Sequence, residues 1–260
     1  MNPDRDPVEC HWAVDGEGAA VTFIHGLGSA HDAWDGIVAE LSHAYQCLRY
    51  DLRGHGQSPV PPPPYVLDDF VDDLAALLDA RDIATSHLVG HSLGGLIAQA
   101  FALRHPGRVA SLVLLSTVAG RSQEERQAVI RLVETLERKG AAAILDQSLE
   151  RWFTPAFREA HPDIIEKRRQ RVLATDPAAF AAAFRVYAES DFGDEISAIT
   201  APTLIMTGEN DVGSNPRIAR YMHDKIAGSQ LVIIPDLRHN ILLEGTAFVA
   251  GRIRDFLAGV

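Results

Sequence analysis

A serine held between two glycines could act as a nucleophile in this chain. Ser92 lies in the stretch SHLVGHSLGG, residues 86–95, with Gly90 and Gly94 two positions away on either side. The stretch joins an apolar strand pattern to an apolar helix pattern, and side chains at the glycine positions would collide with the backbone of so sharp a turn. The helix behind Ser92 would point its free N–H groups at an anion formed there. The pattern predicts an exposed nucleophilic serine.

A serine hydroxyl is a weak nucleophile, so it needs a base, and the base needs an acid to orient it. His239 is the predicted base and Asp211 the predicted acid, because each follows a later strand pattern and falls at the same sheet edge as the serine. Glu209 is the rival acid. His223 lies inside a predicted helix and Asp236 follows the wrong strand, so neither is favoured.

Acyl transfer also needs N–H groups that stabilise the oxyanion of the tetrahedral intermediate. The N–H of Leu93 directly follows the nucleophile, and the second donor should come from the loop after the first buried strand. That loop is His25-Gly26-Leu27-Gly28, in which we predict the N–H of Leu27 as the donor. We expect His25 to brace this loop and not to act as a base.

Strand and helix patterns alternate along the chain, which predicts an α/β fold with a mostly parallel sheet and helices on both faces. The sites of such folds lie at the carboxyl ends of the strands. About seven strand patterns are present, and they cover residues 8–14, 20–24, 46–50, the strand before Ser92, 109–115, 203–207 and 230–234.

Residues 119–196 carry no strand pattern, and we interpret them as an inserted cap of about four helices between core segments 1–118 and 197–260. An insertion after the carboxyl end of a strand lies over the site and can shape a pocket. We expect Trp152 to line that pocket, with packing of the cap against the core as the alternative role. Arg151 and Arg185 are the candidate cations for a substrate that bears a carboxylate.

Three further patterns give local expectations. The segment 66–80 reads as a helix with Phe70, Val71, Leu74, Leu77 and Leu78 facing inward and with Asp68, Asp69, Asp72 and Asp73 facing water. The basic cluster 167–171 reads as a solvated helix face. Cys10 and Cys47 fall in strand patterns and are expected to be buried thiols without a disulfide.

Composition narrows the classes of partner. The 260 residues carry a formal net charge of −11 and no basic stripe, which disfavours a nucleic-acid surface. No Cys/His spacing indicates a metal site, and no cofactor is expected. The first residues lack the apolar core of a signal peptide, and no apolar stretch is long enough to span a membrane. We therefore expect a cytoplasmic protein whose partner is a small-molecule substrate; homo-oligomerisation stays open.

In combination these motifs resemble the α/β-hydrolase family over the whole chain. The resemblance rests on HGLG (25–28), DLRGHGQS (51–58), GHSLGG (90–95), GEND (208–211) and RH (238–239). It implies an eight-stranded, mostly parallel sheet with a lid, the triad Ser92, Asp211 and His239, and an oxyanion hole at Leu27 and Leu93.

Within that family, two cap stretches resemble 3-oxoadipate enol-lactonases and related carboxylesterases. They are LERWFTPAFREAHP (149–162) and AAFAAAFRVYAESDF (178–192). The chain departs from the enol-lactonase pattern at residues 25–28, where an Asn-Ser-Leu-Gly loop is usual, and at Arg238, where a small residue often precedes the histidine.

The predicted function is hydrolysis of a small ester or lactone through an acyl-enzyme on Ser92, in keeping with a role in the catabolism of aromatic compounds. Cleavage of a C–C bond in a ring-fission diketone and hydrolysis of an amide are alternatives. A non-catalytic ligand receptor on the same fold is the alternative from another class. Dehalogenation and epoxide opening are disfavoured because those family members use an aspartate where Ser92 stands.

Overall fold

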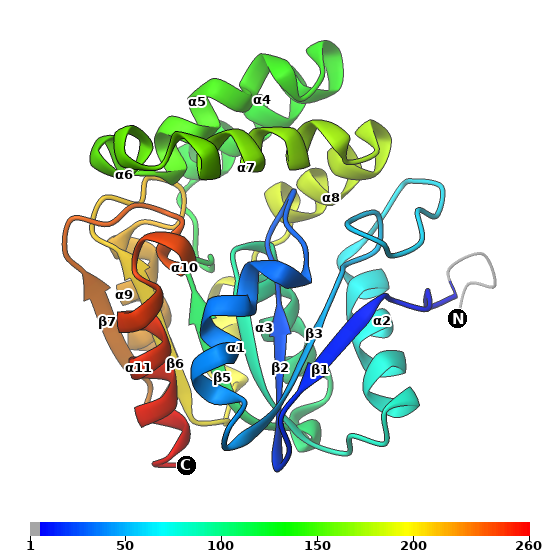
Figure 1. Ribbon diagram of the computed structural model, residues 1–260, viewed down its shortest axis with the longest axis vertical. Coiled ribbons are helices and arrows are strands. Elements are labelled where there is room, and N and C mark those ends of the chain that lie inside the picture. Colours follow the sequence, from blue (N-terminus) through cyan, green and yellow to red (C-terminus); the bar gives the residue numbers. More distant parts are fainter. Residues whose placement is uncertain (1–5) are drawn as a thin grey trace.

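The computed structural model describes residues 6–260. A seven-stranded sheet runs through the centre of this part of the chain (Figure 1). The strands lie in the order β1-β3-β2-β4-β5-β6-β7, and only the edge strand β1 pairs antiparallel. They are β1 (Trp12–Asp15), β2 (Ala19–Ile24), β3 (Tyr45–Tyr50), β4 (Ser86–His91), β5 (Val109–Leu115), β6 (Thr203–Gly208) and β7 (Gln230–Ile234). The predicted α/β class is confirmed, with one strand fewer than the resemblance implies.

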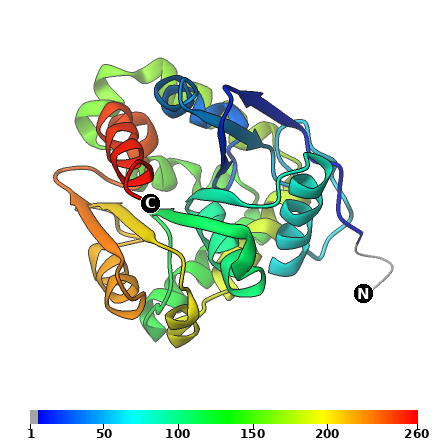
Figure 2. The same ribbon diagram turned by 90° about the horizontal axis from the view of Figure 1, so that it is seen from below.

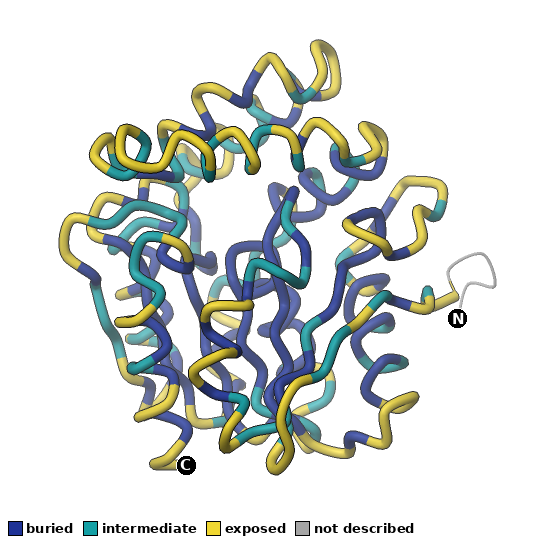
Figure 3. The backbone as a smooth tube through the Cα atoms, viewed as in Figure 1, coloured by how far each residue is buried: buried dark blue, intermediate teal, exposed yellow. Residues whose placement is uncertain are grey.

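Helices cover both faces of this sheet, as Figure 2 shows. Successive side chains of a strand point to opposite faces, so β5 sends Leu112 and Leu114 into one apolar core and Val113 and Leu115 into the other. The inner strands are therefore mostly apolar and largely buried (Figure 3). One core packs against α2 (Leu67–Ala80), α3 (Leu93–Arg104) and α9 (Pro216–Lys225), and the other against α1 (Asp35–Leu41), α10 (Ile241–Glu244) and α11 (Thr246–Leu257).

Five helices lie between β5 and β6, above the carboxyl ends of the strands (Figure 1). They are α4 (Gln123–Lys139), α5 (Ala142–Trp152), α6 (Pro155–Ala160), α7 (Pro162–Ala174) and α8 (Pro177–Glu189). The count exceeds the expected four because Pro155 and Pro162 each begin a new helix, which proline favours at the first helical position. We propose residues 119–196 as the cap.

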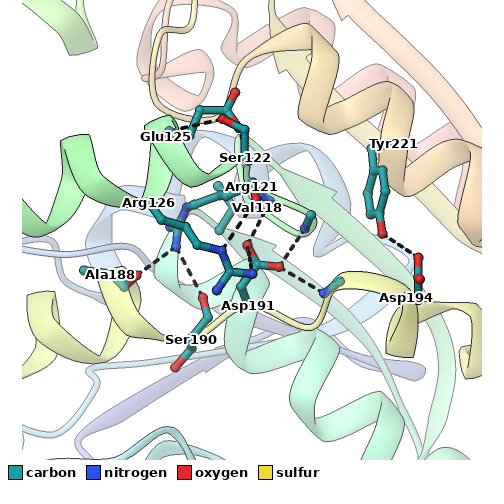
Figure 4. Close-up of polar contacts among 12 residues, drawn as sticks. Val118, Arg121, Ser122, Glu125, Arg126, Ala188, Ser190, Asp191, Asp194 and Tyr221 are labelled. Atoms are coloured by element: carbon teal, nitrogen blue, oxygen red, sulfur yellow. Dashed lines mark hydrogen bonds and ion pairs between the residues drawn. The ribbon is translucent and has the colours of Figure 1, made fainter.

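The two chain crossings between the core and the cap are tied together by hydrogen bonds (Figure 4). The carboxylate of Asp191, on the returning crossing, accepts the N–H groups of Gly120 at 2.7 Å and Arg121 at 2.9 Å on the outgoing one. The guanidinium of Arg121 donates to the carbonyl oxygen of Tyr187 near the end of α8, at 2.9 Å. These contacts fix the first and last helices of the cap relative to each other and to the sheet.

The expectation for the acidic face of α2 is wrong at two of its four positions. Asp69 and Asp73 are buried, whereas Asp68 is exposed and Asp72 partly so. The reason is a buried arginine from the DLRGHGQS loop, because Arg53 donates two hydrogen bonds to the Asp73 carboxylate, each of 2.7 Å. Burying two paired charges in this way pins the loop to α2.

Two details of the N-terminal region differ from or match expectation. Strand β1 is shorter than the predicted 8–14, because the N–H of Val8 donates to the side chain of Asp73 and the N–H of His11 to that of Ser58. Cys10 thus precedes the strand. Cys10 and Cys47 are buried free thiols, as expected, and burial raises the pKa of each to about 12.

Within residues 6–260, no helix combines the length and apolar character that a membrane span requires.

Candidate active site

Ser92 stands at the junction of β4 and α3 in a backbone conformation that few residues adopt. Its φ is 55° and its ψ −116°, which is outside the regions open to most L-residues. The flanking glycines have a direct steric cause. A Cβ at Gly90 would lie 2.3 Å from the carbonyl oxygen of Gly94, and one at Gly94 would lie 2.0 Å from that of Ile24. The turn therefore requires glycine at both positions.

His239 and Asp211 form a hydrogen-bonded pair beside this serine. Nδ1 of His239 lies 2.7 Å from Oδ2 of Asp211, and both side chains line the same cavity as Ser92. The other carboxylate oxygen accepts the N–H groups of Gly213 and Ser214, each at 2.9 Å. Burial alone would raise the pKa of Asp211, but the His239 ring and these N–H donors lower it below its usual range. Asp211 is therefore held as a carboxylate.

Glu209, the rival acid, occupies a different environment. It is exposed, and its carboxylate accepts the N–H of Asp236 at 3.2 Å. It does not line the cavity. His223 lies within α9 as predicted, where its ring contacts Ser229.

Leu27 and Leu93, the predicted oxyanion donors, lie on the two segments that meet at the serine. Leu93 begins α3, and Leu27 lines the cavity from the loop after β2, residues 25–30, which we call the oxyanion loop. A Cβ at Gly26 would lie only 3.0 Å from that of Ser92, so the loop backbone packs directly against Ser92.

His25 holds the oxyanion loop as a neutral ring. Its Nε2 accepts the N–H of Leu52 at 3.0 Å, so the proton is on Nδ1, which donates to the carbonyl oxygen of Gly26 at 2.8 Å. That oxygen also accepts the N–H of Ser29 at 3.2 Å. Burial and the nearby ring of His55 lower the pKa of His25 to about 3. This is the bracing role expected from the sequence.

A cavity of about 580 Å³ lies between the core and the cap, over Ser92. Its walls are mostly apolar side chains of the cap, which include Val129, Leu132, Ile144, Leu145, Trp152, Phe180 and Phe184. Trp152 lines the cavity, and its carbonyl oxygen accepts the N–H of Asn240, the residue after His239, at 2.9 Å. Arg238 adds contacts to the carbonyl oxygens of Glu150 and Phe153. The end of α5 and the loop that carries His239 are therefore joined.

The two predicted cations fall in different places. Arg151 lines the cavity. Arg185 lies outside it, where its guanidinium pairs with Glu137 at 2.5 Å and Glu189 at 2.8 Å.

The cluster 167–171 does not form the solvated face expected of it. Arg168 and Arg171 line the cavity together with Val172 of the next position. The positions i, i+3 and i+4 share one face of a helix, so these three side chains turn toward the cavity together. Arg168 is the functional candidate that sequence reasoning missed.

One group of side chains away from the cavity has the residue types of a metal site. Among residues 6–260, His11, His31 and Asp51 place their ligand atoms within 4.8 Å of one another. The Asp51 carboxylate accepts the N–H groups of His31 at 2.7 Å and Gln57 at 2.9 Å, and it contacts both imidazole rings. Hydrogen bonding accounts for this arrangement.

Comparison with known proteins shows which family and which hydrolases this chain is similar to. A family model described as the alpha/beta hydrolase fold matches residues 19–246. The chain is 29% identical over 215 residues to 3-oxoadipate enol-lactonase 2 of Acinetobacter baylyi, covering 83% of this chain and 80% of that protein. It is 28% identical over 235 residues to the (E)-2-((N-methylformamido)methylene)succinate hydrolase of the same organism, covering 90% and 88%.

Among solved structures, the enol-lactonase from Burkholderia xenovorans LB400 superimposes with a TM-score of 0.91 at 30% identity. The match covers 96% of this chain and 97% of that one. The predicted likeness to enol-lactonases is thereby confirmed.

We expect Asp211→Asn to lower kcat by a factor on the order of 10³ or more, because an amide neither fixes the imidazole tautomer nor stabilises the imidazolium. Glu209→Gln, the matched variant that removes one charge from the same loop, should change kcat less than about three-fold. Steady-state kinetics on a p-nitrophenyl ester makes the comparison. A larger loss in Glu209→Gln would transfer the role of the acid to Glu209.

Three buried histidines around the site should make folding sensitive to acid. Burial lowers the pKa of His25 and His91 to about 3 and of His55 to about 4, against 6.5 in the unfolded chain. Below pH 6.5 the unfolded chain takes up protons that the folded chain refuses, so stability falls as pH falls. The loss at pH 5 is about 2 kcal/mol for each histidine.

Urea denaturation at pH 7 and pH 5 measures this effect as a fall in the free energy of unfolding. Replacing one of the three, in His55→Gln, should reduce the fall between the two pH values by about 2 kcal/mol, which is the contribution of one histidine. His43→Gln, at an exposed position, should leave it unchanged. Equal stability of the wild type at the two pH values would contradict the assignment.

Proposed function

The chain belongs to the α/β-hydrolase family, and we propose that it is a serine-dependent hydrolase of a small carboxylic ester or lactone. The observation that carries the proposal is the His239–Asp211 hydrogen bond of 2.7 Å beside a serine in a strained turn, all on one cavity. A nucleophile, a base and an acid that orients the base are what acyl transfer through a covalent intermediate requires, and the chain order Ser92, Asp211, His239 is the usual one in this fold.

In the proposed reaction, Oγ of Ser92 attacks the carbonyl carbon while Nε2 of His239 accepts the hydroxyl proton. The negative charge that forms on the carbonyl oxygen is stabilised by the N–H groups of Leu27 and Leu93. When the intermediate collapses, the C–O bond to the leaving group breaks and His239 returns the proton to the departing oxygen. Water then attacks the acyl-enzyme by the same route and regenerates Ser92.

Asp211 supports both halves of this cycle. Its hydrogen bond to Nδ1 directs the lone pair of Nε2 toward the serine, and its charge stabilises the imidazolium that appears in each transition state. The lowered pKa of Asp211 supports this role, because the carboxylate stays charged across the pH range in which a histidine base is neutral.

The mostly apolar walls of the cavity favour a substrate with a small apolar part. Arginine side chains in the lining favour an acyl or leaving group that carries a negative charge. We propose that Trp152 and Arg151 contact the substrate, because both line the cavity. A volume of about 580 Å³ is within the range of small-molecule sites. The likeness to the (E)-2-((N-methylformamido)methylene)succinate hydrolase of Acinetobacter baylyi favours an amide as the second candidate, since the same groups can cleave a C–N bond.

A substrate panel tests the proposal. It contains p-nitrophenyl acetate and butyrate, 3-oxoadipate enol-lactone, a ring-fission diketone and (E)-2-((N-methylformamido)methylene)succinate. We expect an ester or lactone to give the highest kcat/KM, and Ser92→Ala to lower that value by a factor on the order of 10³ or more.

Ser197→Ala is the matched control, because Ser197 is an exposed serine whose hydroxyl bonds to the carbonyl oxygen of Asp194. It should keep the wild-type rate. Near-wild-type turnover by Ser92→Ala would overturn the proposal. A wild-type protein that binds these compounds and cleaves none of them would point to a receptor.

A further inference from the structure

Cap helix α7 holds the oxyanion loop through a guanidinium group. Nη2 of Arg168 donates to the carbonyl oxygen of Leu27 at 2.8 Å, and Nη1 donates to that of Gly28. The guanidinium lies 5.1 Å above the ring of Trp152, a cation–π distance. No carboxylate of residues 6–260 pairs with it. The charge of Arg168 is thus directed at backbone carbonyl groups of the loop.

Further contacts join α7 and the neighbouring α8 to the same loop region. One turn after Arg168, Arg171 forms a two-pronged ion pair with Asp32, with both N···O distances 2.5 Å. Gly28 has a φ of +58°, and a Cβ there would lie 2.9 Å from Val172 and 3.1 Å from Phe180. The cap helices therefore pack closely against the loop at Gly28, and Arg168 and Arg171 bind it before and after that glycine.

The Arg168 contact completes the restraint on the Leu27 backbone. The peptide plane before the Leu27 Cα is held at the carbonyl oxygen of Gly26 by the His25 ring and the N–H of Ser29. The plane after it is held at the Leu27 carbonyl oxygen by Arg168. The Leu27 N–H lies in the first plane, and rotation of that plane would turn it away from its direction. The second plane anchors the Leu27 Cα on which the first plane pivots, so restraint of both planes preorganises the donor.

We propose that Arg168 is a positioning residue that makes the oxyanion hole depend on the seating of the cap. The inference rests on the proposed hydrolase function, because it assigns the Leu27 N–H to the oxyanion. Arg168 acts through Leu27 and Gly28 and not on the substrate. The second pair, Arg171–Asp32, keeps the helix in the register at which the Arg168 fork meets both carbonyl groups.

Two substitutions at Arg168 separate positioning from recognition of substrate charge. Arg168→Met removes the donors and keeps the length of the side chain, whereas Arg168→Lys keeps the charge but lacks the planar fork. Arg169→Met is the matched control, because within residues 6–260 Arg169 pairs with Asp146 at 2.6 Å and Glu166 at 3.4 Å and lies off the cavity. Each variant is assayed on neutral p-nitrophenyl butyrate and on the anionic mono-p-nitrophenyl succinate.

We expect Arg168→Met to lower kcat about 10- to 100-fold on both esters with KM changed less than about three-fold. A misplaced oxyanion donor lowers kcat by at most as much as the removal of that donor. Arg168→Lys should fall between wild type and Arg168→Met, and Arg169→Met should match wild type. A rise in KM confined to the anionic ester would instead assign Arg168 to substrate binding. Unchanged kcat with a lower thermal midpoint would reduce it to a packing role. Either result overturns the proposal.

Amide hydrogen exchange of the peptide covering residues 25–34, measured without substrate, keeps the test independent of activity. Exchange should be at least about ten-fold faster in Arg168→Met and unchanged in Arg169→Met, because only the first loses the restraint on the loop. If the wild type shows no turnover that depends on Ser92, the proposed function fails while this measurement still judges the contact. Equal exchange in wild type and Arg168→Met would refute the role of Arg168 even in an active hydrolase.

Discussion

The strained backbone at Ser92 is the constraint on which the rest of the structure depends. A left-handed conformation at a residue with a side chain costs about 1–3 kcal/mol and persists only where its surroundings over-determine it. Here the N–H of Ser92 donates to the carbonyl oxygen of Leu115 at 2.9 Å, and its own carbonyl oxygen accepts the hydroxyl of Thr117 at 2.7 Å. Both partners belong to β5 or to the residues that follow it, so pairing of the central strands holds the serine in its turn.

The sheet and the cap contribute different parts of the site around that turn. The sheet brings the loops after β2, β4, β6 and β7 to one edge, and buried polar groups outside the cavity hold the region of the first of these loops. Asp51 accepts the N–H of His31, next to the oxyanion loop, and Arg53 ties the same motif to α2 through Asp73. The motif DLRGHGQS therefore stabilises the region next to the oxyanion loop from outside the cavity. The cap contributes the apolar walls of the cavity and reaches back to the oxyanion loop through Arg168.

Much of the fold could be predicted because its signals are local. A run of apolar residues that ends in a glycine-flanked serine contains within ten residues what the strand–turn–helix at Ser92 needs. The errors concern faces whose partners are distant in sequence. Asp73 of α2 looked solvated because nothing nearby reveals that Arg53 is buried against it. Arg168 lies on the polar helix α7 and Arg185 on the largely apolar helix α8, and only tertiary packing decides that the first turns toward the cavity and the second away from it.

Covalent capture of the nucleophile tests the central claim most directly. An organophosphate ester phosphorylates a serine that a neighbouring base activates, and leaves ordinary surface serines unmodified. Incubation of the full chain with such an ester, followed by digestion and mass spectrometry, locates the adduct. One phosphoryl group on the peptide that contains Ser92, gained in step with loss of esterase activity and absent from Ser92→Ala, is the predicted result. Inactivation with the adduct on another residue, or full activity after Ser92 is labelled, would contradict it.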